Sequence, residues 1–385
     1  MSGATATFFR YQLPLTRPFV LRQQSMCERI GLLVRLRTSA GATAWGEIAP
    51  LPVFSREALD EALRQALDVA AVLVRRDLDQ ADPHLIGLRR QENIYGSVRF
   101  GLESALAGLQ AVHAGTHPAT LLAETPPQSV HANALLTGVG TEVIDEALAL
   151  AERGYTAIKL KVGRMIIRDE AATVRDLRAE LPPQVAIRLD ANRAWSFDDA
   201  RAFASAAKPE SFAYIEEPLS NPGQLPELTA RSGIAYAVDE TLQDLGWRIA
   251  ASLREHGEDA MDHYPSYPDS SLAHAALGAV AWIVKPTLLG APLEFLSDTA
   301  PRGGYSGPVV VSSSFESGLG LAMLAQLAAT ANRDTIAAGL DTQRWIAADT
   351  LEEDLLNVDG TCDLQRAWEL AQHPRMDRLE EIAHV

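Results

Sequence analysis

Apolar and polar positions follow two different patterns along the chain, and the change between them comes near residue 130. Before it, alternating runs rich in β-branched and aromatic residues predict strands at residues 5–13, 30–37 and 42–47. Helical periodicity then begins at Ser55, which suits an N-cap, and continues to Arg76; a second helical pattern covers residues 97–114. Strands that precede helices, rather than alternate with them, indicate an α+β domain.

After residue 130, short apolar runs alternate with helical segments. The predicted strands are residues 132–136, 157–162, 186–190, 212–216, 236–239, 281–285, 309–313 and 337–341. Eight strands with helices between them, over about 215 residues, fit a closed parallel barrel. We therefore predict a first domain at residues 1–128 and a barrel at residues 129–343. We expect residues 344–385 to pack back on the first domain.

One interval breaks the rhythm of strands and helices. The step of 46 positions from Asp239 to Lys285 includes turn-rich sequence at 256–259 and 264–269, which favours a loop over a barrel helix. We interpret this segment as an insertion of about 20 residues on one βα unit, a size that loops tolerate. Because it follows a strand end, we hypothesise that it covers a substrate or mediates contacts between subunits.

Five charged residues each close a short apolar run: Lys161, Asp190, Glu216, Asp239 and Lys285. The intervals between them are 29, 26, 23 and 46 residues, which matches one site per βα unit with a double step at the end. The carboxyl ends of barrel strands converge on one open face, and buried charge is costly unless the charges serve each other or a ligand. The spacing therefore predicts an active site.

The two lysines of the second barrel strand share one face, because side chains alternate along a strand. Lys159 and Lys161 then point into the barrel, while the apolar residues between and beside them point to the helices. On an exposed strand a solvated face would explain such lysines, but strands of a parallel barrel are buried on both faces. Like charge and desolvation lower a lysine pKa, so one lysine can be a neutral base near pH 7.

Three carboxylates end three consecutive predicted strands: Asp190, Glu216 and Asp239. They would repel one another without a cation, and oxygen-only ligands favour Mg²⁺ over Zn²⁺. A helix N-cap explains any one of them, but it explains poorly all three in register. Glu217 and Glu240, one residue further on, are expected to point elsewhere and to support the site from behind.

Lys285 ends the sixth strand and is expected to face the lysine pair across the barrel mouth. Opposed lysines around a metal suit the removal of a proton beside a carboxylate, with the cation holding the developing enediolate.

Composition narrows the possible partners. A formal charge of −16, with no long run among the 34 lysines and arginines, argues against nucleic acid and leaves an anionic small molecule open. Cys27 and Cys362 lack metal-ligand spacing and are interpreted as two reduced thiols. The first 20 residues lack the sustained apolar core of a signal peptide or membrane span, so we predict a cytoplasmic protein without membrane contact. The sequence leaves the oligomeric state open.

The order of lysines and carboxylates resembles that of the enolase superfamily. Within it, the chain is similar over nearly its whole length to the o-succinylbenzoate synthase family of menaquinone biosynthesis. The motifs that carry the likeness are WGEIAPLP at 45–52 with Phe54 and Ser55, RLDANRAW at 188–195, KPTL at 285–288, SSSFES at 312–317 and GLDT at 339–342.

The resemblance implies an α/β fold in which an α+β capping domain closes over a modified TIM barrel of (β/α)7β type. Asp190, Glu216 and Asp239 would bind Mg²⁺, with Mn²⁺ as a possible substitute. Lys161 would be the acid/base residue, tuned by Lys159, and Lys285 would stabilise the enediolate. Arg188 and Asn192 would support the metal and the substrate carboxylate. Backbone N–H groups around Ser312, Ser313 and Ser314 would receive a second, succinyl carboxylate.

The implied reaction is a syn β-elimination of water from 2-succinyl-6-hydroxy-2,4-cyclohexadiene-1-carboxylate, which gives aromatic o-succinylbenzoate. Such an enzyme is a carbon–oxygen lyase, and the aromatic product favours the reaction. The insertion before Lys285 is longer than we expect for this family.

Two kinds of alternative remain open. Within the superfamily, an N-acylamino-acid racemase, a dipeptide epimerase or a muconate cycloisomerase also uses opposed lysines and Mg²⁺. Dipeptide epimerases share an Asp-x-Asp on the eighth strand, whereas here Asp341 is followed by Thr342 and Gln343. The motif at 45–55 argues against the cycloisomerase and, less strongly, the racemase. A non-catalytic binding protein on the same barrel would be free to lose some of the five charged positions, and all five are present.

Overall fold

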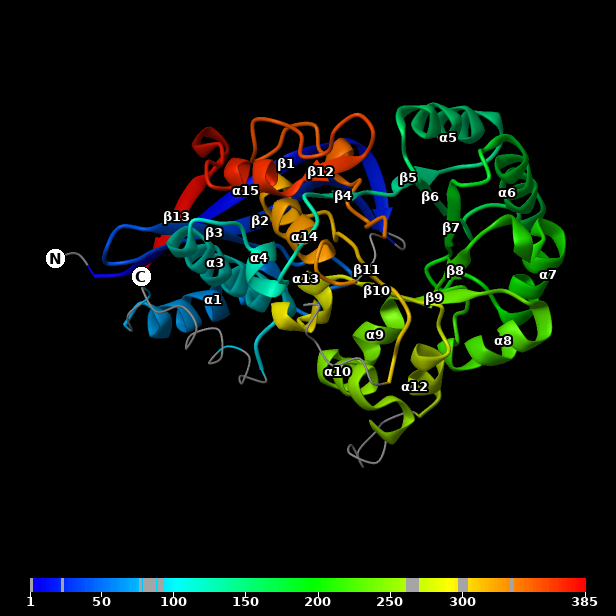
Figure 1. The fold of residues 1–385 in the computed structure, drawn as a ribbon, viewed down its shortest axis with the longest axis horizontal. Coiled ribbons are helices and arrows are strands. Elements are labelled where there is room, and N and C mark those ends of the chain that lie inside the picture. Colours follow the sequence, from blue (N-terminus) through cyan, green and yellow to red (C-terminus); the bar gives the residue numbers. More distant parts are fainter. Residues whose placement is uncertain are drawn as a thin grey trace.

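The computed structural model of the chain describes residues 3–21, 24–75, 78, 88, 93–260, 270–296, 304–332 and 336–385. Two bodies lie side by side in Figure 1. One is an antiparallel sheet with helices against it, and the other is a curled parallel sheet with helices around its outer face. The predicted α/β fold, a modified TIM barrel with an α+β capping domain, is confirmed.

The capping sheet has the order β13-β1-β2-β3. Its strands are β1 (Thr5–Leu21), β2 (Gln24–Arg37), β3 (Thr43–Ile48) and β13 (Glu380–His384). β1 and β2 run further than the predicted 5–13 and 30–37, as a two-stranded ribbon. The sequence did not predict this extension, because Pro14 and Pro18 lie in it and proline usually argues against a strand. The pairing accommodates them with a register shift between Pro14 and Phe19.

The helices of the capping domain are α1 (Leu59–Leu73), α3 (Gly96–Ala114) and the short α4 (Ala119–Leu122). α1 begins later than predicted, because Ser55 accepts a hydrogen bond from the Leu51 N–H in a turn instead of capping the helix. The predicted end at Arg76 lies outside the described residues. α3 packs closely on β3: a Cβ at Gly46 would lie 1.9 Å from the carbonyl oxygen of Gly101.

The parallel sheet has seven described strands, and each pairs with the next one in chain order. They are β5 (Ala134–Thr137), β6 (Ala157–Lys161), β7 (Ala186–Asp190), β8 (Tyr214–Glu216), β9 (Tyr236–Val238), β10 (Ala281–Val284) and β11 (Val309–Val311). The predicted eighth strand is reduced to two parallel bridges, Ala338 with Ala132 and Gly339 with Ser312. The first bridge joins this segment to the residues just before β5 and the second joins it to the end of β11, so the two together close the barrel.

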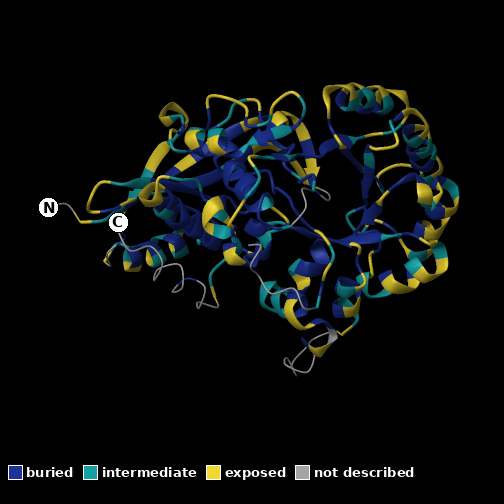
Figure 2. Cartoon of the chain, in the orientation of Figure 1, coloured by how far each residue is buried: buried dark blue, intermediate teal, exposed yellow. Residues whose placement is uncertain are grey.

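Helices cover the outer face of the barrel (Figure 1). They are α5 (Thr141–Arg153), α6 (Ile167–Glu180), α7 (Phe197–Ala207), α8 (Leu225–Ser232), α9 (Glu240–Leu245), α10 (Trp247–His256), α12 (Ser270–Leu277), α13 (Pro286–Leu289) and α14 (Gly318–Ala328). Short 3-10 turns lie at η1 (Pro209–Ser211), η2 (Pro222–Gln224), η3 (Gly257–Asp259) and η4 (Leu293–Leu296). The barrel strands are mostly coloured as buried in Figure 2, and apolar side chains of strands and helices form one buried core.

The described part of the segment interpreted as a loop insertion is largely helical, which corrects that prediction. α10 buries Ala250 and Leu253, and the buried Arg254 donates to the Phe295 carbonyl, so this helix packs on the barrel. The predicted turn at 256–259 is present as the end of α10 and η3. The second predicted turn, residues 264–269, lies outside the described residues.

The C-terminal segment contributes to both bodies. η5 (Gln343–Trp345) follows the barrel, β12 (Thr361–Asp363) pairs with β4 (Ser129–His131), and α15 (Leu364–Ala371), η6 (Met376–Arg378) and β13 complete the chain. β13 pairs with β1, and Leu15 of the ribbon forms a bridge with Ile346. Cys27 and Cys362 are both free thiols. Within the described part of the chain, no helix is both long and apolar enough to span a bilayer.

Candidate active site

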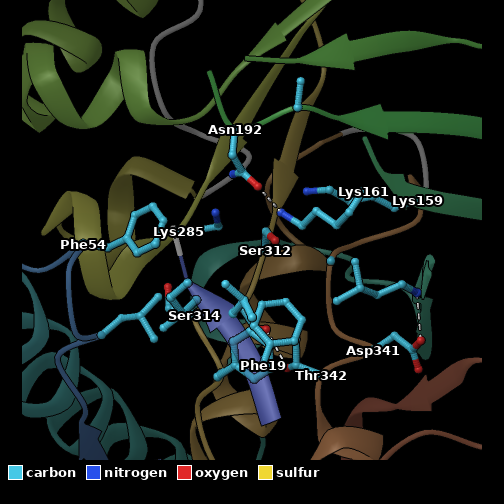
Figure 3. Close-up of a pocket in the computed structure, with 18 of the residues that line it drawn as sticks. Phe19, Phe54, Lys159, Lys161, Asn192, Lys285, Ser312, Ser314, Asp341 and Thr342 are labelled. Atoms are coloured by element: carbon cyan, nitrogen blue, oxygen red, sulfur yellow. Dashed lines mark hydrogen bonds between the residues drawn. The ribbon is translucent and has the colours of Figure 1, made fainter. Parts of the chain in front are cut away.

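A cavity of about 530 Å³ lies at the carboxyl ends of the barrel strands, beneath the ribbon of the capping domain. The capping domain contributes apolar walls from Phe19, Leu51 and Phe54. Phe19 packs on Phe315 of the barrel, with ring centroids 4.5 Å apart. Figure 3 shows Phe54 and Lys285 on one side of the cavity, Lys159 and Lys161 on the other, and Phe19 below them. The cavity can therefore enclose a small molecule between an apolar cover and a charged floor.

Three lysines line this cavity: Lys159, Lys161 and Lys285 (Figure 3). The first two extend from the same face of β6, and Lys285 follows β10 on the opposite wall. Only four of the 34 basic residues are lysines, and the fourth, Lys208, is exposed after α7. Unlike arginine, lysine can lose its proton in a protein, so this choice of residue suits acid/base chemistry.

The three carboxylates lie just below the lysines and are almost completely buried: Asp190, Glu216 and Asp239. The Lys159 ammonium lies 2.8 Å from Asp190 Oδ2 and 2.7 Å from Glu216 Oε2. Lys161 lies 2.6 Å from Asp190 Oδ2, and Lys285 pairs with Asp239. Neighbouring strands place Asp190 directly beside Glu216 in register. The structure thus brings together all five charged strand ends predicted from the sequence.

Helix capping does not explain Asp239. It occupies the N-cap position of α9, yet its side chain makes no capping hydrogen bond. Its Oδ1 accepts instead from the Gln243 side chain at 2.8 Å. The carboxylate therefore points toward the cluster of charges and away from the helix backbone.

The donor set fits a divalent cation with oxygen ligands. Glu216 Oε1 is buried and has no hydrogen-bond partner, which leaves an acceptor available for an ion. Among the described residues, no three His, Cys, Asp or Glu side chains lie close enough together to bind a metal ion. At the strand ends the lysine ammoniums occupy the space between the carboxylates. Residues at these strand ends could hold a metal if the ammoniums turned toward the cavity that they line.

Burial and charge act differently on the lysines. Burial lowers the pKa of Lys161, and the neighbouring Lys159 and Lys285 lower it further, while Asp190 opposes them. Burial also disfavours the charged form of Lys159, but Asp190 and Glu216 outweigh it and raise the pKa of Lys159. The same balance, with Asp239 as the partner, raises the pKa of Lys285. Lys161 is therefore the lysine of the three whose neutral form the surroundings favour.

A second layer of polar residues supports the strand ends. Glu217 turns away from the cavity and accepts the N–H groups of Asp239 at 2.9 Å and Thr241 at 2.7 Å. Asn192 accepts from Lys161 at 2.7 Å, and its amide donates to Glu240 at 3.2 Å. Asn192 and Glu217 both have positive φ angles, 45° and 43°. Such strained backbone is common at functional sites, where surrounding contacts hold it.

Arg188 does not line the cavity, so the structure does not favour a direct contact between Arg188 and a substrate. It lies on β7 opposite Lys159 and donates to Asn133 Oδ1 at 3.2 Å and to the Ala337 carbonyl at 2.6 Å. Asn133 does line the cavity, and our sequence reasoning missed it. The signal was a single polar residue within the apolar first strand.

Ser312, Ser313 and Ser314 line the cavity, but their backbone N–H groups are not free to bind an anion there. They donate to the Val284 carbonyl, the Gly339 carbonyl and Glu316 Oε2, at 2.9, 2.9 and 2.5 Å. The expected backbone donors are therefore engaged at all three positions, by carbonyls of β10 and of Gly339 on either side and by a buried carboxylate. The buried Ser314 hydroxyl, in contrast, has no partner.

Comparisons with known families and structures agree with this architecture. Residues 142–262 match the enolase C-terminal domain-like family, and residues 4–109 match the family of the MenC N-terminal domain. A crystal structure of an enolase superfamily member from Roseovarius nubinhibens, complexed with magnesium, has a TM-score of 0.77 and 19% identity and covers 100% of this chain and 99% of its own. Muconate lactonizing enzyme from Pseudomonas fluorescens has a TM-score of 0.77 and 21% identity, with 94% of each chain covered. The fold is that of the enolase superfamily.

Sequence relatives narrow this class. A protein of Yersinia pseudotuberculosis named o-succinylbenzoate synthase is 33% identical over 347 residues, which cover 88% of this chain and 90% of the relative. A Yersinia pestis protein of the same name is 33% identical over 345 residues, with the same coverage. The chain belongs to the o-succinylbenzoate synthase family, whose members are carbon–oxygen lyases of the hydro-lyase type.

Proposed function

We propose that this protein catalyses the Mg²⁺-dependent dehydration of 2-succinyl-6-hydroxy-2,4-cyclohexadiene-1-carboxylate to o-succinylbenzoate, a step of menaquinone biosynthesis. The observation that carries the proposal is the meeting of three buried strand-end carboxylates with three lysines that line one cavity. The family of the chain supplies the substrate class. The cavity suits a ligand with both charged and apolar parts, since apolar residues of the capping domain and three lysines line it together.

Asp190, Glu216 and Asp239 are proposed to hold Mg²⁺, with Mn²⁺ as a substitute. When bound, such a cation supplies fixed positive charge beside a substrate carboxylate, which makes the adjacent C–H proton more acidic. The unpartnered Glu216 Oε1 supports this role.

Lys161 is proposed as the acid/base residue. Its neutral amine takes the proton from the carbon beside the ring carboxylate, and the electron pair of that C–H bond moves into the carboxylate as an enediolate develops. When this pair returns to form a ring double bond, the C–O bond to the hydroxyl breaks. Lys161 then returns the proton to the departing hydroxyl, so that water leaves and the amine is neutral again. A single residue on one face of the ring can perform both transfers, because in a syn elimination the proton and the hydroxyl leave from the same face. The hydrogen bond from Lys161 to Asn192 fixes the position of the amine.

Lys285 and Lys159 are proposed to act through charge. Lys285 lies across the cavity and, as an ammonium, stabilises the negative charge that develops on the ring carboxylate. Lys159 is held by two carboxylates and keeps its proton, so its positive charge favours the neutral form of Lys161.

The hydroxyl groups of the loop after β11 are proposed to receive the succinyl carboxylate. Ser314 Oγ is buried without a partner and belongs to a residue that lines the cavity. The Ser313 hydroxyl lies 2.6 Å from the Thr342 hydroxyl, and both residues line the same wall. Ser312 is the third lining serine of this wall. Arg188 is proposed to act indirectly, by fixing Asn133.

Two alternatives remain for the test. A racemase would use Lys161 and Lys285 from opposite faces, and both residues line the cavity. A dipeptide epimerase is less suited, because Asp341 is already engaged by the Leu135 N–H at 2.9 Å and by Arg344 at 2.8 Å.

The test uses the purified full-length chain with Mg²⁺. Incubation with the cyclohexadiene substrate is followed by ultraviolet absorbance of the aromatic product, and a parallel incubation with one enantiomer of an N-acylated amino acid is followed by polarimetry. We expect aromatic product that disappears on chelation with EDTA. Racemisation without dehydration would replace the proposal with the racemase, and neither reaction in a protein that fails to bind Mg²⁺ would favour the non-catalytic alternative.

A further inference from the structure

Glu47 is a buried carboxylate of the capping domain that reaches into the barrel. It lies on β3, yet it accepts the N–H groups of Ser317 and Gly320, both at 2.9 Å, at the start of α14. It also accepts the Ser317 hydroxyl at 2.6 Å and the Tyr11 hydroxyl at 2.5 Å. Each carboxylate oxygen of Glu47 therefore accepts two hydrogen bonds. The three contacts with Ser317 and Gly320 join segments about 270 residues apart in sequence.

The start of α14 is built to receive this carboxylate. Ser317 occupies the N-cap position of α14, but its side chain makes no capping hydrogen bond, so Glu47 satisfies the N–H groups that a cap would otherwise take. A Cβ at Gly320 would lie 2.6 Å from Glu47 Oε2, so only glycine lets the carboxylate approach this closely. A negative charge at this end of a helix is also favourable.

Ser312, Ser313 and Ser314, just before α14, line one wall of the cavity, which we call the serine wall. Glu316 accepts the Ser314 N–H and, through its other oxygen, the Thr287 hydroxyl at 2.5 Å. The buried Arg29 of the capping domain donates to the Phe315 carbonyl at 2.9 Å. Phe315 lines the cavity and holds a left-handed φ of 61°. Side chains of the capping domain therefore hold both Phe315 and Ser317.

We propose that Glu47 is a positioning residue, which anchors residues 312–317 so that the Ser313 and Ser314 hydroxyls face the second carboxylate of the substrate. The proposal rests on the proposed function for the identity of that substrate. It implies that the serine wall is set only when the capping domain is docked on α14. Recognition of the succinyl arm then depends on a residue that does not line the cavity.

A merely structural role is distinguished by a matched control. Glu57 is also a buried carboxylate of the capping domain, and it accepts the N–H of Ser97 at 3.2 Å and its hydroxyl at 2.5 Å in the first turn of α3. Its contacts stay within the capping domain. Glu57→Gln therefore removes the same chemistry without touching the serine wall.

The experiment compares the wild type, Glu47→Gln and Glu57→Gln. Dissociation constants for o-succinylbenzoate and for benzoate, which lacks the arm, are measured by tryptophan fluorescence, and kcat and KM are measured with the proposed substrate. In Glu47→Gln an amide N–H₂ faces N–H and O–H donors, so we expect affinity for o-succinylbenzoate to fall about tenfold, with benzoate affinity unchanged. We expect KM to rise similarly and kcat to change less. Glu57→Gln is expected to keep wild-type affinities.

Gly320→Ala gives a second route if Glu47→Gln fails to fold. It keeps the carboxylate and adds a methyl group against it in a helix that tolerates alanine, so it should also reduce the preference for o-succinylbenzoate over benzoate. An unchanged preference in whichever of these two variants folds, with wild-type KM, would overturn the proposal. Absence of turnover in the wild type would overturn the proposed function instead, and the binding ratios would still decide the role of Glu47.

Discussion

Buried carboxylates occur in two regions of this molecule, and their surroundings differ. At the seam between the capping domain and the barrel, Glu47 and Glu316 accept hydrogen bonds from fixed N–H and O–H groups on both oxygens. At the barrel mouth, Asp190 and Glu216 contact lysines that line a cavity, and Glu216 Oε1 has no partner. A carboxylate whose acceptors are all used indicates a fixed contact, whereas a spare acceptor beside lysines that line a cavity indicates a place for a ligand.

The largest expected difference concerns activity. Lys161→Ala should lower kcat about 10³-fold or more, because it removes the proposed group that both takes and returns the proton. Lys208→Ala is the matched control, since Lys208 is the one lysine of the chain outside the cavity. Product formation is followed by absorbance. Activity within tenfold of wild type in Lys161→Ala would contradict the role of Lys161.

The next difference concerns stability without metal. In Glu316→Gln an amide N–H₂ faces a donor at the seam, so the free energy of unfolding should fall by about 1–3 kcal/mol. In Glu216→Gln the amide oxygen can still accept from Lys159 while the N–H₂ replaces an unpartnered oxygen, so stability should stay equal or rise. Urea unfolding with EDTA present measures both. Equal losses of unfolding free energy in the two variants would contradict the proposed difference between Glu316 at the seam and Glu216 at the barrel mouth.

A smaller difference concerns pH. Burial raises the pKa of Glu47 to about 7, with Glu316 adding to the shift and the hydrogen bonds from Ser317 and Tyr11 opposing it. A carboxyl whose pKa is higher in the folded than in the unfolded state contributes stability below about pH 4.5, which is lost as pH rises through 7. The wild type should therefore lose up to about 3 kcal/mol relative to Glu47→Gln between pH 4.5 and 8.

Urea unfolding of the two proteins across this pH range provides the measurement. A constant difference in the free energy of unfolding would mean that Glu47 has the same pKa in the folded and unfolded states.

Much of the barrel could be predicted from the sequence, because its signals are local. The strand before Asp190 was predicted with the bounds observed, and the charged strand ends met as their spacing required. Long-range packing decided the parts that were missed. Pro14 and Pro18 argued against the ribbon, and the segment between Asp239 and Lys285 was interpreted as a loop insertion although it contains α10, whose apolar face packs on the barrel. The domain boundaries at residues 128 and 343 stay a prediction.

The candidate site shows the same division. Residue type and alternation predicted which way Lys159 and Lys161 point, since both depend on one strand. The partners of the Ser312–Ser314 amides could not be predicted, because they come from neighbouring strands and from Glu316. Glu47 belongs to the WGEIAPLP motif at 45–52, but its contact with α14 depends on how two segments distant in sequence pack together.

Metal binding tests the central claim most directly. Mg²⁺ is titrated by isothermal calorimetry into EDTA-treated and dialysed wild type, Glu216→Gln and Glu316→Gln at one pH. The account predicts one site per chain in the wild type and in Glu316→Gln, with affinity reduced at least about 100-fold in Glu216→Gln, where a ligand oxygen and its charge are lost. Wild-type affinity in Glu216→Gln, or loss of binding in Glu316→Gln alone, would contradict it.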